Sequence, residues 1–520
     1  MKDMKPDLTR RRFLATTAIA SATAAAGLPL AGPGRLMAQD APRVLRVASG
    51  EGDKTQGPLD PALSAIDPDS ARIGCCFERL TRFDVDMNVV PQLATSWESD
   101  DTGAVWTFHL RENVRFGDGT PMTAADVVFS FRRIVDPEVG SPGAGLLSAL
   151  PATGVEAVDD LTVRFTLSSP VVEFPSLITN RFTYIVKAGQ SSEDLRTRGI
   201  GTGAYRVGHF VPGEEPAIFE RNEYYWREGF PKFDRLELRS IPDPAAHVAA
   251  LLSGQIDLSW DIPRSGVQAL EASPEVEVLT QRSGFVISMA MQVDKAPFDD
   301  VRVRTAMKLV TDRQIILDGA LSGYGNLGND NPVAPWVPYG IEEPPRPRDV
   351  ETAKALLAEA GHPDGIDVEL YTSEATPGFV EMATLYQALA ADAGIRVTIN
   401  RAPAHDYFAN VWRKVPFCCA SKSGRTADEA MALFYLSGVS WNDTNWKNAD
   451  FDAAIAEARQ TLDPGKRTEL YQKAQRLIQE DGGVILPVFS AVLGAQRTGL
   501  TGWTLPVQKY DVEFTEVAPA

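Results

Sequence analysis

Short apolar runs, separated by turn-forming residues, recur along most of the chain. Alternating or β-branched apolar patterns predict strands at residues 44–48, 105–110, 161–167, 235–241, 275–279, 368–371 and 397–399. Apolar residues repeated every three to four positions predict helices at residues 301–310, 350–360, 379–393, 451–459 and 466–479. The alternation of strands and helices after residue 290 favours an α/β lobe with a largely parallel sheet.

Polar residues at the predicted helix starts support these assignments. Thr123 and Asp126 suit a helix N-terminus before the apolar residues that reach Ile134. Asp349 precedes the helix predicted at residues 350–360, and Asp463 followed by Pro464 precedes the one predicted at 466–479. These residues place the helix starts to within a residue or two.

The N-terminal segment has the features of an export signal. Residues 9–14 read T-R-R-R-F-L, and an apolar stretch rich in small residues follows. That stretch is too short to cross a bilayer as a helix, which needs about 20 residues. The segment resembles a twin-arginine signal, so we predict export to the periplasm by the twin-arginine export machinery and cleavage after Ala38. No cysteine precedes Cys75, which argues against a lipid anchor.

Composition and charge predict a globular chain and narrow its partners. The 520 residues carry 51 Lys and Arg against 69 Asp and Glu, a formal net charge of −18. Residues 1–38 contribute six basic and two acidic side chains, so the predicted mature chain carries −22. This charge repels phosphate backbones and anionic membranes, so we expect no nucleic-acid partner. No later apolar run is long enough to span a membrane, and we expect a soluble, monomeric periplasmic protein.

Motifs for catalysis, metal binding and cofactor binding are absent or lack their structural context. The five histidines lie singly, so no metal site is predicted. No G-x-S-x-G, H-E-x-x-H or P-loop sequence occurs. Residues 323–328 match G-x-G-x-x-G, but a helical segment precedes them where a nucleotide site needs a strand, so we interpret them as a flexible loop. We therefore expect no catalytic residues and no cofactor.

The four cysteines form two vicinal pairs, Cys75-Cys76 and Cys418-Cys419. Adjacent cysteines bond each other only with strain. Two alternatives stay open. In an oxidising compartment one long-range disulfide could join the pairs, or all four could be buried small apolar residues, which the apolar neighbours favour.

Five blocks of the sequence resemble one known family. Residues 93–128 read LATSWESDDTGAVWTFHLRENVRFGDGTPMTAADVV and resemble the signature of the family 5 extracellular solute-binding proteins, the oligopeptide and dipeptide receptors of ABC importers. Four more blocks follow in the family's order, at residues 201–257, 297–304, 353–365 and 446–487. In the first block Phe116, Asp118 and Gly119 suit a tight turn in which Asp118 binds backbone amides.

The resemblance implies an α/β fold of the two-lobed periplasmic binding protein type, class II, with an additional third domain. Lobe I would comprise residues 39–82, 200–288 and 488–520, and residues 83–199 would form the extra domain inserted in it. Residues 289–487 would form lobe II. The ligand would lie between lobes that close by hinge bending.

The resemblance also suggests ligand-binding residues. Peptide-binding members hold the ligand's ammonium with an aspartate in a G-W-x-x-D segment, and the similar segment here is 424–428, with Arg425 in place of the aromatic residue. Asp428 is therefore a candidate ligand contact, although Thr426 and Glu429 also form a capping-box pattern in which Asp428 is only a first-turn acid. Arg425 is a candidate partner for a ligand carboxylate.

Two further candidates lie in a loop before a predicted helix. Trp441 and Asn442 are placed there, where side chains are available to a ligand. Dipeptide-type members also carry an arginine where this chain has residues 379–381, Phe-Val-Glu, which argues against a free dipeptide as the ligand.

The leading hypothesis is a periplasmic receptor that captures a peptide or peptide-like solute and delivers it to the membrane permease subunits of an ABC importer. The same role for a non-peptide solute, such as an opine, a modified sugar or a metal chelate, stays open. A hypothesis of another class is an exported periplasmic enzyme. The absence of catalytic and cofactor motifs argues against it.

Overall fold

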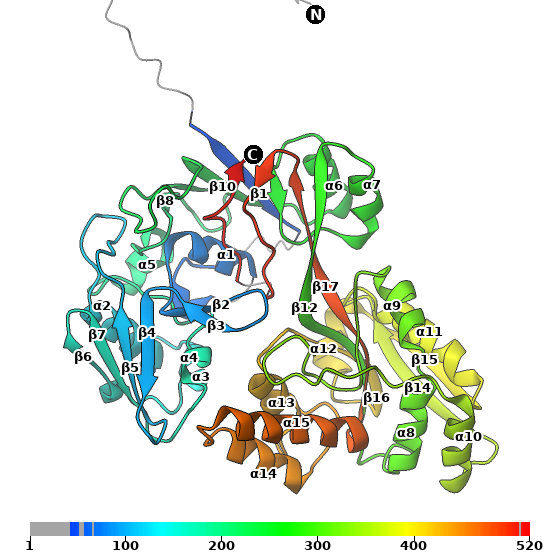
Figure 1. Cartoon of the computed structure of the whole chain (residues 1–520). Coiled ribbons are helices and arrows are strands. Elements are labelled where there is room, and N and C mark those ends of the chain that lie inside the picture. Colours follow the sequence, from blue (N-terminus) through cyan, green and yellow to red (C-terminus); the bar gives the residue numbers. More distant parts are fainter. Residues whose placement is uncertain (1–41, 51–56, 65–66, 509–510) are drawn as a thin grey trace, which may run out of the picture. The chain divides into compact units, whose positions relative to one another are not determined.

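One large sheet runs through the described chain, which comprises residues 42–50, 57–64, 67–508 and 511–520 of a computed structural model. The export signal predicted for residues 1–38 lies outside these residues. The strands follow one another in the order β15-β14-β16-β12-β17-β11-β1-β10-β9-β8, and β13 pairs with β17 (Figure 1). In chain order these strands are β1 (Val44–Ser49), β8 (Tyr205–His209), β9 (Ala217–Arg221), β10 (Arg235–Ser240), β11 (Leu258–Ser259), β12 (Val276–Met291), β13 (Gly325–Leu327), β14 (Ile366–Ser373), β15 (Ile395–Ala402), β16 (Phe417–Lys422) and β17 (Val484–Arg497).

Strands β12 and β17 are the longest of these and join the two ends of the sheet. They pair antiparallel along most of their length and lie side by side as green and red ribbons in Figure 1. Between Gln281 and Phe285 the register shifts, because β12 advances four residues while β17 advances two, from Val492 to Ser490. A bulge of this kind bends the pair locally. It separates the part of β12 that neighbours β11 across β17 from the part that pairs with β16.

The strands on either side of the bulge form two groups. The β1 side comprises β11, β1, β10, β9 and β8, in which β1 pairs parallel with β10 and β11. The β14 side comprises β14, β15 and β16, in which β14 pairs parallel with both neighbours. The prediction of an α/β fold is confirmed, but a largely parallel sheet after residue 290 holds only for the β14 side. The sheet is mixed, because β12 and β17 run antiparallel to each other.

Helices on the β14 side begin close to the predicted positions. The Asp349 carboxylate accepts a hydrogen bond from Thr352 N at 2.9 Å, and the Asp463 carboxylate accepts one from Lys466 N at 2.7 Å. Both aspartates therefore cap their helices as predicted. The helices in this part of the chain are α8 (Val301–Leu309), α9 (Arg313–Leu321), α10 (Val350–Glu359), α11 (Phe379–Ala391), α12 (Tyr407–Asn410), α13 (Ala427–Tyr435), α14 (Ala449–Ala458) and α15 (Pro464–Asp481).

A second, four-stranded antiparallel sheet is formed between residues 94 and 166, in the order β4-β5-β7-β6. Phe131 of α2 packs edge-on against Phe165 of this sheet, with ring centroids 4.8 Å apart. Asp118 accepts a hydrogen bond from Thr120 N at 3.1 Å, as predicted for the turn before α2. The elements here and nearby are α1 (Asp67–Cys76), β2 (Thr81–Phe83), β3 (Val89–Pro91), β4 (Ala94–Ser99), β5 (Val105–Leu110), α2 (Ala124–Val135), α3 (Gly143–Leu146), β6 (Val155–Asp159), β7 (Thr162–Thr166), α4 (Phe174–Leu177), α5 (Ser192–Arg198), α6 (Pro244–Leu252) and α7 (Val267–Glu271).

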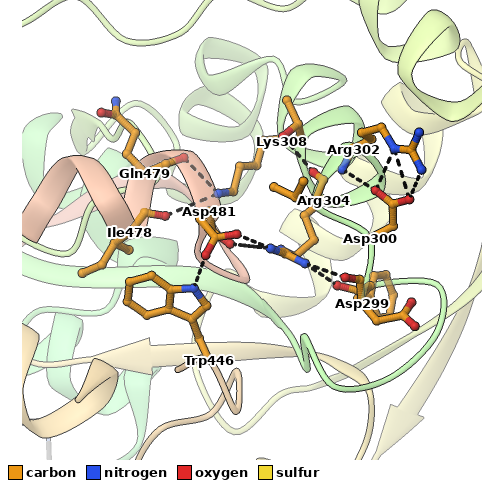
Figure 2. A network of polar contacts seen from close by, with 12 residues as sticks. Asp299, Asp300, Arg302, Arg304, Lys308, Trp446, Ile478, Gln479 and Asp481 are labelled. Atoms are coloured by element: carbon orange, nitrogen blue, oxygen red, sulfur yellow. Dashed lines mark hydrogen bonds and ion pairs between the residues drawn. The ribbon is translucent and has the colours of Figure 1, made fainter. Parts of the chain in front are cut away.

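A polar network ties α8 to the end of α15 (Figure 2). Arg304 donates to the Asp481 carboxylate at 2.6 Å and to the Asp481 carbonyl at 2.8 Å, and Trp446 Nε1 donates to the same carboxylate at 2.7 Å. Lys308 is fully buried, and its ammonium donates to the Gln479 carbonyl at 3.0 Å. Burial lowers the pKa of Lys308 to about 7. These bonds satisfy carbonyls that an α-helix leaves unpaired at its C-terminus.

Two sequence interpretations are decided by the structure. All four cysteines are buried and free, with Cys75 and Cys76 in one hydrophobic core and Cys418 and Cys419 in another, so the long-range disulfide is not formed. The prediction of a flexible loop at residues 323–328 is wrong, because Gly325–Leu327 form β13 and pair with β17. No helix of the described residues is both long and apolar enough to cross a membrane.

Candidate functional site

A cavity of about 730 Å³ lies between the β1 side and the β14 side. On the β1 side it is lined by Gly50, which follows β1, and by Trp260 to Arg264, which follow β11. On the β14 side it is lined by Thr376 and Pro377 after β14, and by Ser423 and Gly424 after β16. Each of these segments leaves the carboxyl end of a strand that pairs in parallel, which is where open α/β sheets bind ligands.

Arg264 is the basic side chain of this cavity wall. Its Nη2 donates to Ser490 Oγ, while its buried Nε has no hydrogen-bond partner. It forms no ion pair with any described residue. Burial lowers the pKa of Arg264, and the exposed carboxylate of Glu381 opposes that shift from a distance. The cavity wall therefore carries a positively charged group that no described carboxylate neutralises by direct pairing.

Two other titratable residues line the cavity near Gly50. The Asp261 carboxylate accepts hydrogen bonds from Gly50 N at 2.8 Å and from Ser49 Oγ at 3.1 Å, which fixes the chain just after β1. His247 is fully buried, and its Nε2 lies 2.9 Å from Ser259 Oγ. Burial lowers the pKa of His247 to about 4, so the imidazole is neutral at pH 7.

The bulge in β12 reaches the cavity and is held by hydrogen bonds. Ser283 Oγ donates to the Ser490 carbonyl at 2.8 Å and accepts from Phe285 N at 3.1 Å. Ser283, Phe285 and Ser490 all line the cavity. On its far wall, Gln508 Nε2 donates to the Gly424 carbonyl at 3.2 Å. The bulge of β12, which joins the β1 side to the β14 side, is thus part of the cavity wall.

A second cavity, of about 440 Å³, lies between residues 145–177 and the region of α13. Asp428, a residue predicted to contact ligand, lines it. Both carboxylate oxygens of Asp428 accept from Arg459 at 2.8 Å, and one also accepts from Tyr471 Oη at 3.1 Å. Thr426 Oγ1 accepts from Glu429 N, so the predicted cap is present. Asp428 therefore has internal partners, and a ligand would share its carboxylate with them.

The other three predicted residues lie nearby. Arg425 and Trp441 both contact the ring of Phe434, the guanidinium carbon at 5.8 Å and the indole at 5.7 Å from its centroid. Asn442 is buried, and its amide donates to the Trp446 carbonyl at 2.7 Å while its oxygen accepts from Thr444 Oγ1 at 3.0 Å. None of the four predicted residues lines the 730 Å³ cavity.

Sequence reasoning missed the residues that do line it. Arg264 and Phe285 belong to no motif that the sequence singled out, and His247 lies in the block at residues 201–257 without having been named as a site residue. A usable signal was present, since Trp260, Asp261 and Arg264 follow the alternating segment 256–259, the position of side chains at the carboxyl end of a strand. Gly424 opens the segment 424–428 that the resemblance singled out, and the structure shows that a Cβ there would lie 3.0 Å from the backbone of Gly284. No group of three or more His, Cys, Asp or Glu in the described residues could hold a metal ion.

This chain is similar in sequence and in fold to known proteins. Residues 88–464 match the family described as bacterial extracellular solute-binding proteins, family 5 Middle. The glutathione-binding protein GsiB of Escherichia coli (strain K12) is 27% identical over 458 residues, covering 85% of this chain and 88% of GsiB.

Solved structures of other proteins are also similar to this chain in sequence and in fold. HbpA2 from Haemophilus parasuis is 25% identical, with a TM-score of 0.78, over 92% of this chain and 100% of that one. MoaA in complex with mannopinic acid, from A. tumefacien R10, is 27% identical, with a TM-score of 0.69, over 91% of this chain and 99% of that one. With the family match spanning most of the sequence, the chain belongs to the family 5 bacterial extracellular solute-binding proteins, the non-enzymatic substrate-binding receptors of ABC importers.

Proposed function

We propose that this chain is a periplasmic receptor for a peptide or peptide-like solute, which it binds in the 730 Å³ cavity and delivers to the permease subunits of an ABC importer. The resemblance to GsiB, named for binding glutathione, supports a peptide-like solute. Passage to the periplasm would follow the twin-arginine signal read in residues 1–38.

The cavity's position is the observation that carries this proposal. Its volume falls within the roughly 300–1,000 Å³ of small-molecule sites. The β1 side and the β14 side both contribute to its wall, so a bound solute would contact both at once. A receptor that must hold a solute and later release it needs such a divided site, because a small relative motion then opens every contact.

The bulge between Gln281 and Phe285 supports a hinge at this place. We propose that the domains are those that the family resemblance implies. Lobe I would comprise residues 39–82, 200–288 and 488–520, the inserted domain residues 83–199, and lobe II residues 289–487. On this proposal only β12 and β17 need to bend. The Ser283 and Ser490 hydrogen bonds would limit the path of that bending.

The segment after β16 runs from the larger cavity to the smaller one, which Asp428 lines. Ser423 and Gly424 line the larger cavity, and Thr426 and Asp428 line the smaller one. A solute long enough to follow this segment would reach Asp428. We propose Asp428 and Arg425 as contacts for such a solute, with Trp441 and Asn442 shaping the loop beside them.

A non-peptide solute is the second candidate. MoaA, solved with mannopinic acid, resembles this chain in sequence to the same degree as GsiB does. The same cavity would then hold an opine-like acid. The two candidates share the receptor role and differ in the solute alone.

Native mass spectrometry of the protein isolated from its own periplasm tests the proposal. We expect a retained solute whose mass equals that of a short peptide or a peptide conjugate, and we expect adding that solute to raise the melting temperature of stripped protein. A retained opine would select the second candidate. A protein that retains nothing and is stabilised by no peptide or opine would refute the receptor proposal.

A further inference from the structure

Arg264 is partly buried and has no carboxylate partner among the described residues. A cation removed from water without a carboxylate partner is strongly destabilising in a folded protein. Several basic side chains with less exposure are ion-paired: Arg133 with Asp60, Arg313 with Asp330, and Lys422 with Asp443. Buried Lys308 lacks a carboxylate partner but donates to two carbonyls at a helix C-terminus. Among the described residues, Arg264 has only Ser490 Oγ, a neutral partner.

The orientation of Arg264 is nevertheless fixed. Its Nη2 is held by Ser490 in β17, at the bulge, and its Nε is buried without a partner. Its Nη1 donates to no described residue. Trp260, Ile262, Pro263 and Phe285 form much of the wall around it. An anion that entered here would meet a preoriented donor beside apolar side chains, where a charge-assisted hydrogen bond is stronger than one between neutral groups.

From this arrangement we infer that Arg264 is a specificity-determining residue that binds a carboxylate group of the transported solute. The inference rests on the proposed receptor function and adds to it the chemical class of the solute. A free acid is accepted, and the corresponding neutral amide or ester is discriminated against.

The wall also argues for a carboxylate over a more highly charged group. Among the described lining residues, Arg264 is the one Lys or Arg, and Asp261 contributes a negative charge to the same wall. The Arg264 cation offsets one negative charge, and the nearby Asp261 carboxylate disfavours a second one, so a phosphate dianion would stay less well compensated than a monoanion. A peptide C-terminus and an acidic opine both meet this requirement.

Calorimetry on matched ligand pairs tests the inference. The stripped wild-type chain and Arg264→Gln are titrated with trialanine and trialanine amide, with glutathione, with mannopinic acid, and with the retained solute and its methyl ester. Arg396→Gln is the control, because Arg396 is exposed and ion-paired to Asp367 away from the cavity. The melting temperature of each ligand-free chain is recorded as well.

We expect the free acids to bind Arg264→Gln about 10- to 100-fold more weakly than wild type, the loss of one charge-assisted hydrogen bond. Amides and esters should bind both chains alike, and Arg396→Gln should match wild type. The ligand-free Arg264→Gln chain should melt no lower than wild type, because the uncompensated cation is gone. A purely structural arginine would lower that melting temperature and weaken acids and amides equally.

The remaining outcomes count against the inference in distinguishable ways. A free acid that binds wild type and Arg264→Gln within twofold overturns the assignment of Arg264 and leaves the receptor function standing. An amide that binds wild type as tightly as its acid overturns the carboxylate preference. If neither the panel nor any retained solute binds wild type, the receptor proposal fails, and this inference fails with it.

Discussion

Gly284 and Gly424 lie back to back across the joint between the two sides of the sheet. A Cβ on Gly284 would lie 3.0 Å from the Cα of Gly424, and a Cβ on Gly424 would lie 3.0 Å from the backbone nitrogen of Gly284. Gly284 belongs to the bulge of β12, and Gly424 lines the cavity. Contacts between backbones this close leave no room for a side chain.

Replacing Gly424 by alanine should therefore weaken solute binding. The methyl group would have to displace backbone, and overpacking of this kind costs about 1–3 kcal/mol. If the two sides relieve the clash by separating, we expect affinity for the retained solute to fall about tenfold. Isothermal calorimetry measures this directly.

The matched control is Gly117→Ala, since a Cβ at Gly117 would meet nothing closer than 3.5 Å and Gly117 lines neither cavity. It should leave affinity unchanged and raise stability slightly by restricting the unfolded chain. Unchanged affinity in Gly424→Ala would mean that the glycine contact plays no part in closing the cavity.

His247 should make stability depend on pH. Its pKa in the folded chain is lowered by burial to about 4, against about 6.5 when unfolded. The unfolded chain therefore binds more protons between these values, and the contribution is present above pH 6.5 and lost as the pH falls toward 4. We expect this to amount to about 3 kcal/mol, measured by urea unfolding at pH 7, 5.5 and 4.

His247→Gln should flatten the unfolding profile by that amount. His405→Gln should not, because the His405 side chain is 81% exposed. Parallel profiles for wild type and His247→Gln would show that the buried imidazole does not set the acid sensitivity.

The network of Figure 2 should be a large source of stability. Arg304→Met removes the donor to the Asp481 carbonyl, to one Asp481 carboxylate oxygen and to the Phe298 carbonyl. We expect a loss of about 2 kcal/mol in the free energy of unfolding, less than for a fully buried ion pair, because Arg304 is buried but the Asp481 side chain is 41% exposed. Urea titration measures it, with exposed Arg302→Met as the comparison. A loss below 1 kcal/mol in Arg304→Met would contradict this role.

Export should depend on the paired arginines. Changing Arg10 and Arg11 together to lysine keeps the charge and should abolish appearance of the protein in the periplasm, because the pattern resembles a twin-arginine signal. Immunoblots of cell fractions test this, and mass spectrometry of the exported wild type locates the cut, expected after Ala38. Normal export of the double variant would point to another export route.

The helices and strands were largely predictable because their signals are local. Asp349 and Asp463 cap helices, and Val105–Leu110 alternates between buried and less buried residues, as their sequences indicate. Strand β12 was predicted only at residues 275–279, although it continues to Met291. Its second half is buried between β16 and β17, so it lacks the polar alternation that marks a half-exposed strand.

The candidate cavity was not predictable because its walls come from distant parts of the chain. Arg264 and Gly424 are 160 positions apart in the sequence and line one cavity only after β11 and β16 are placed in one sheet. The family resemblance directed attention to Asp428, which lines a different cavity. Local patterns identified the capping role of Thr426 but contain no information on which surfaces face each other.

A crystal structure of the protein with its retained solute tests the central claim most directly. We expect the solute in the 730 Å³ cavity, in contact with Gly424 on the β14 side and with a carboxylate on Arg264 on the β1 side. A solute bound only in the 440 Å³ cavity beside Asp428, with the larger cavity holding water alone, would contradict it.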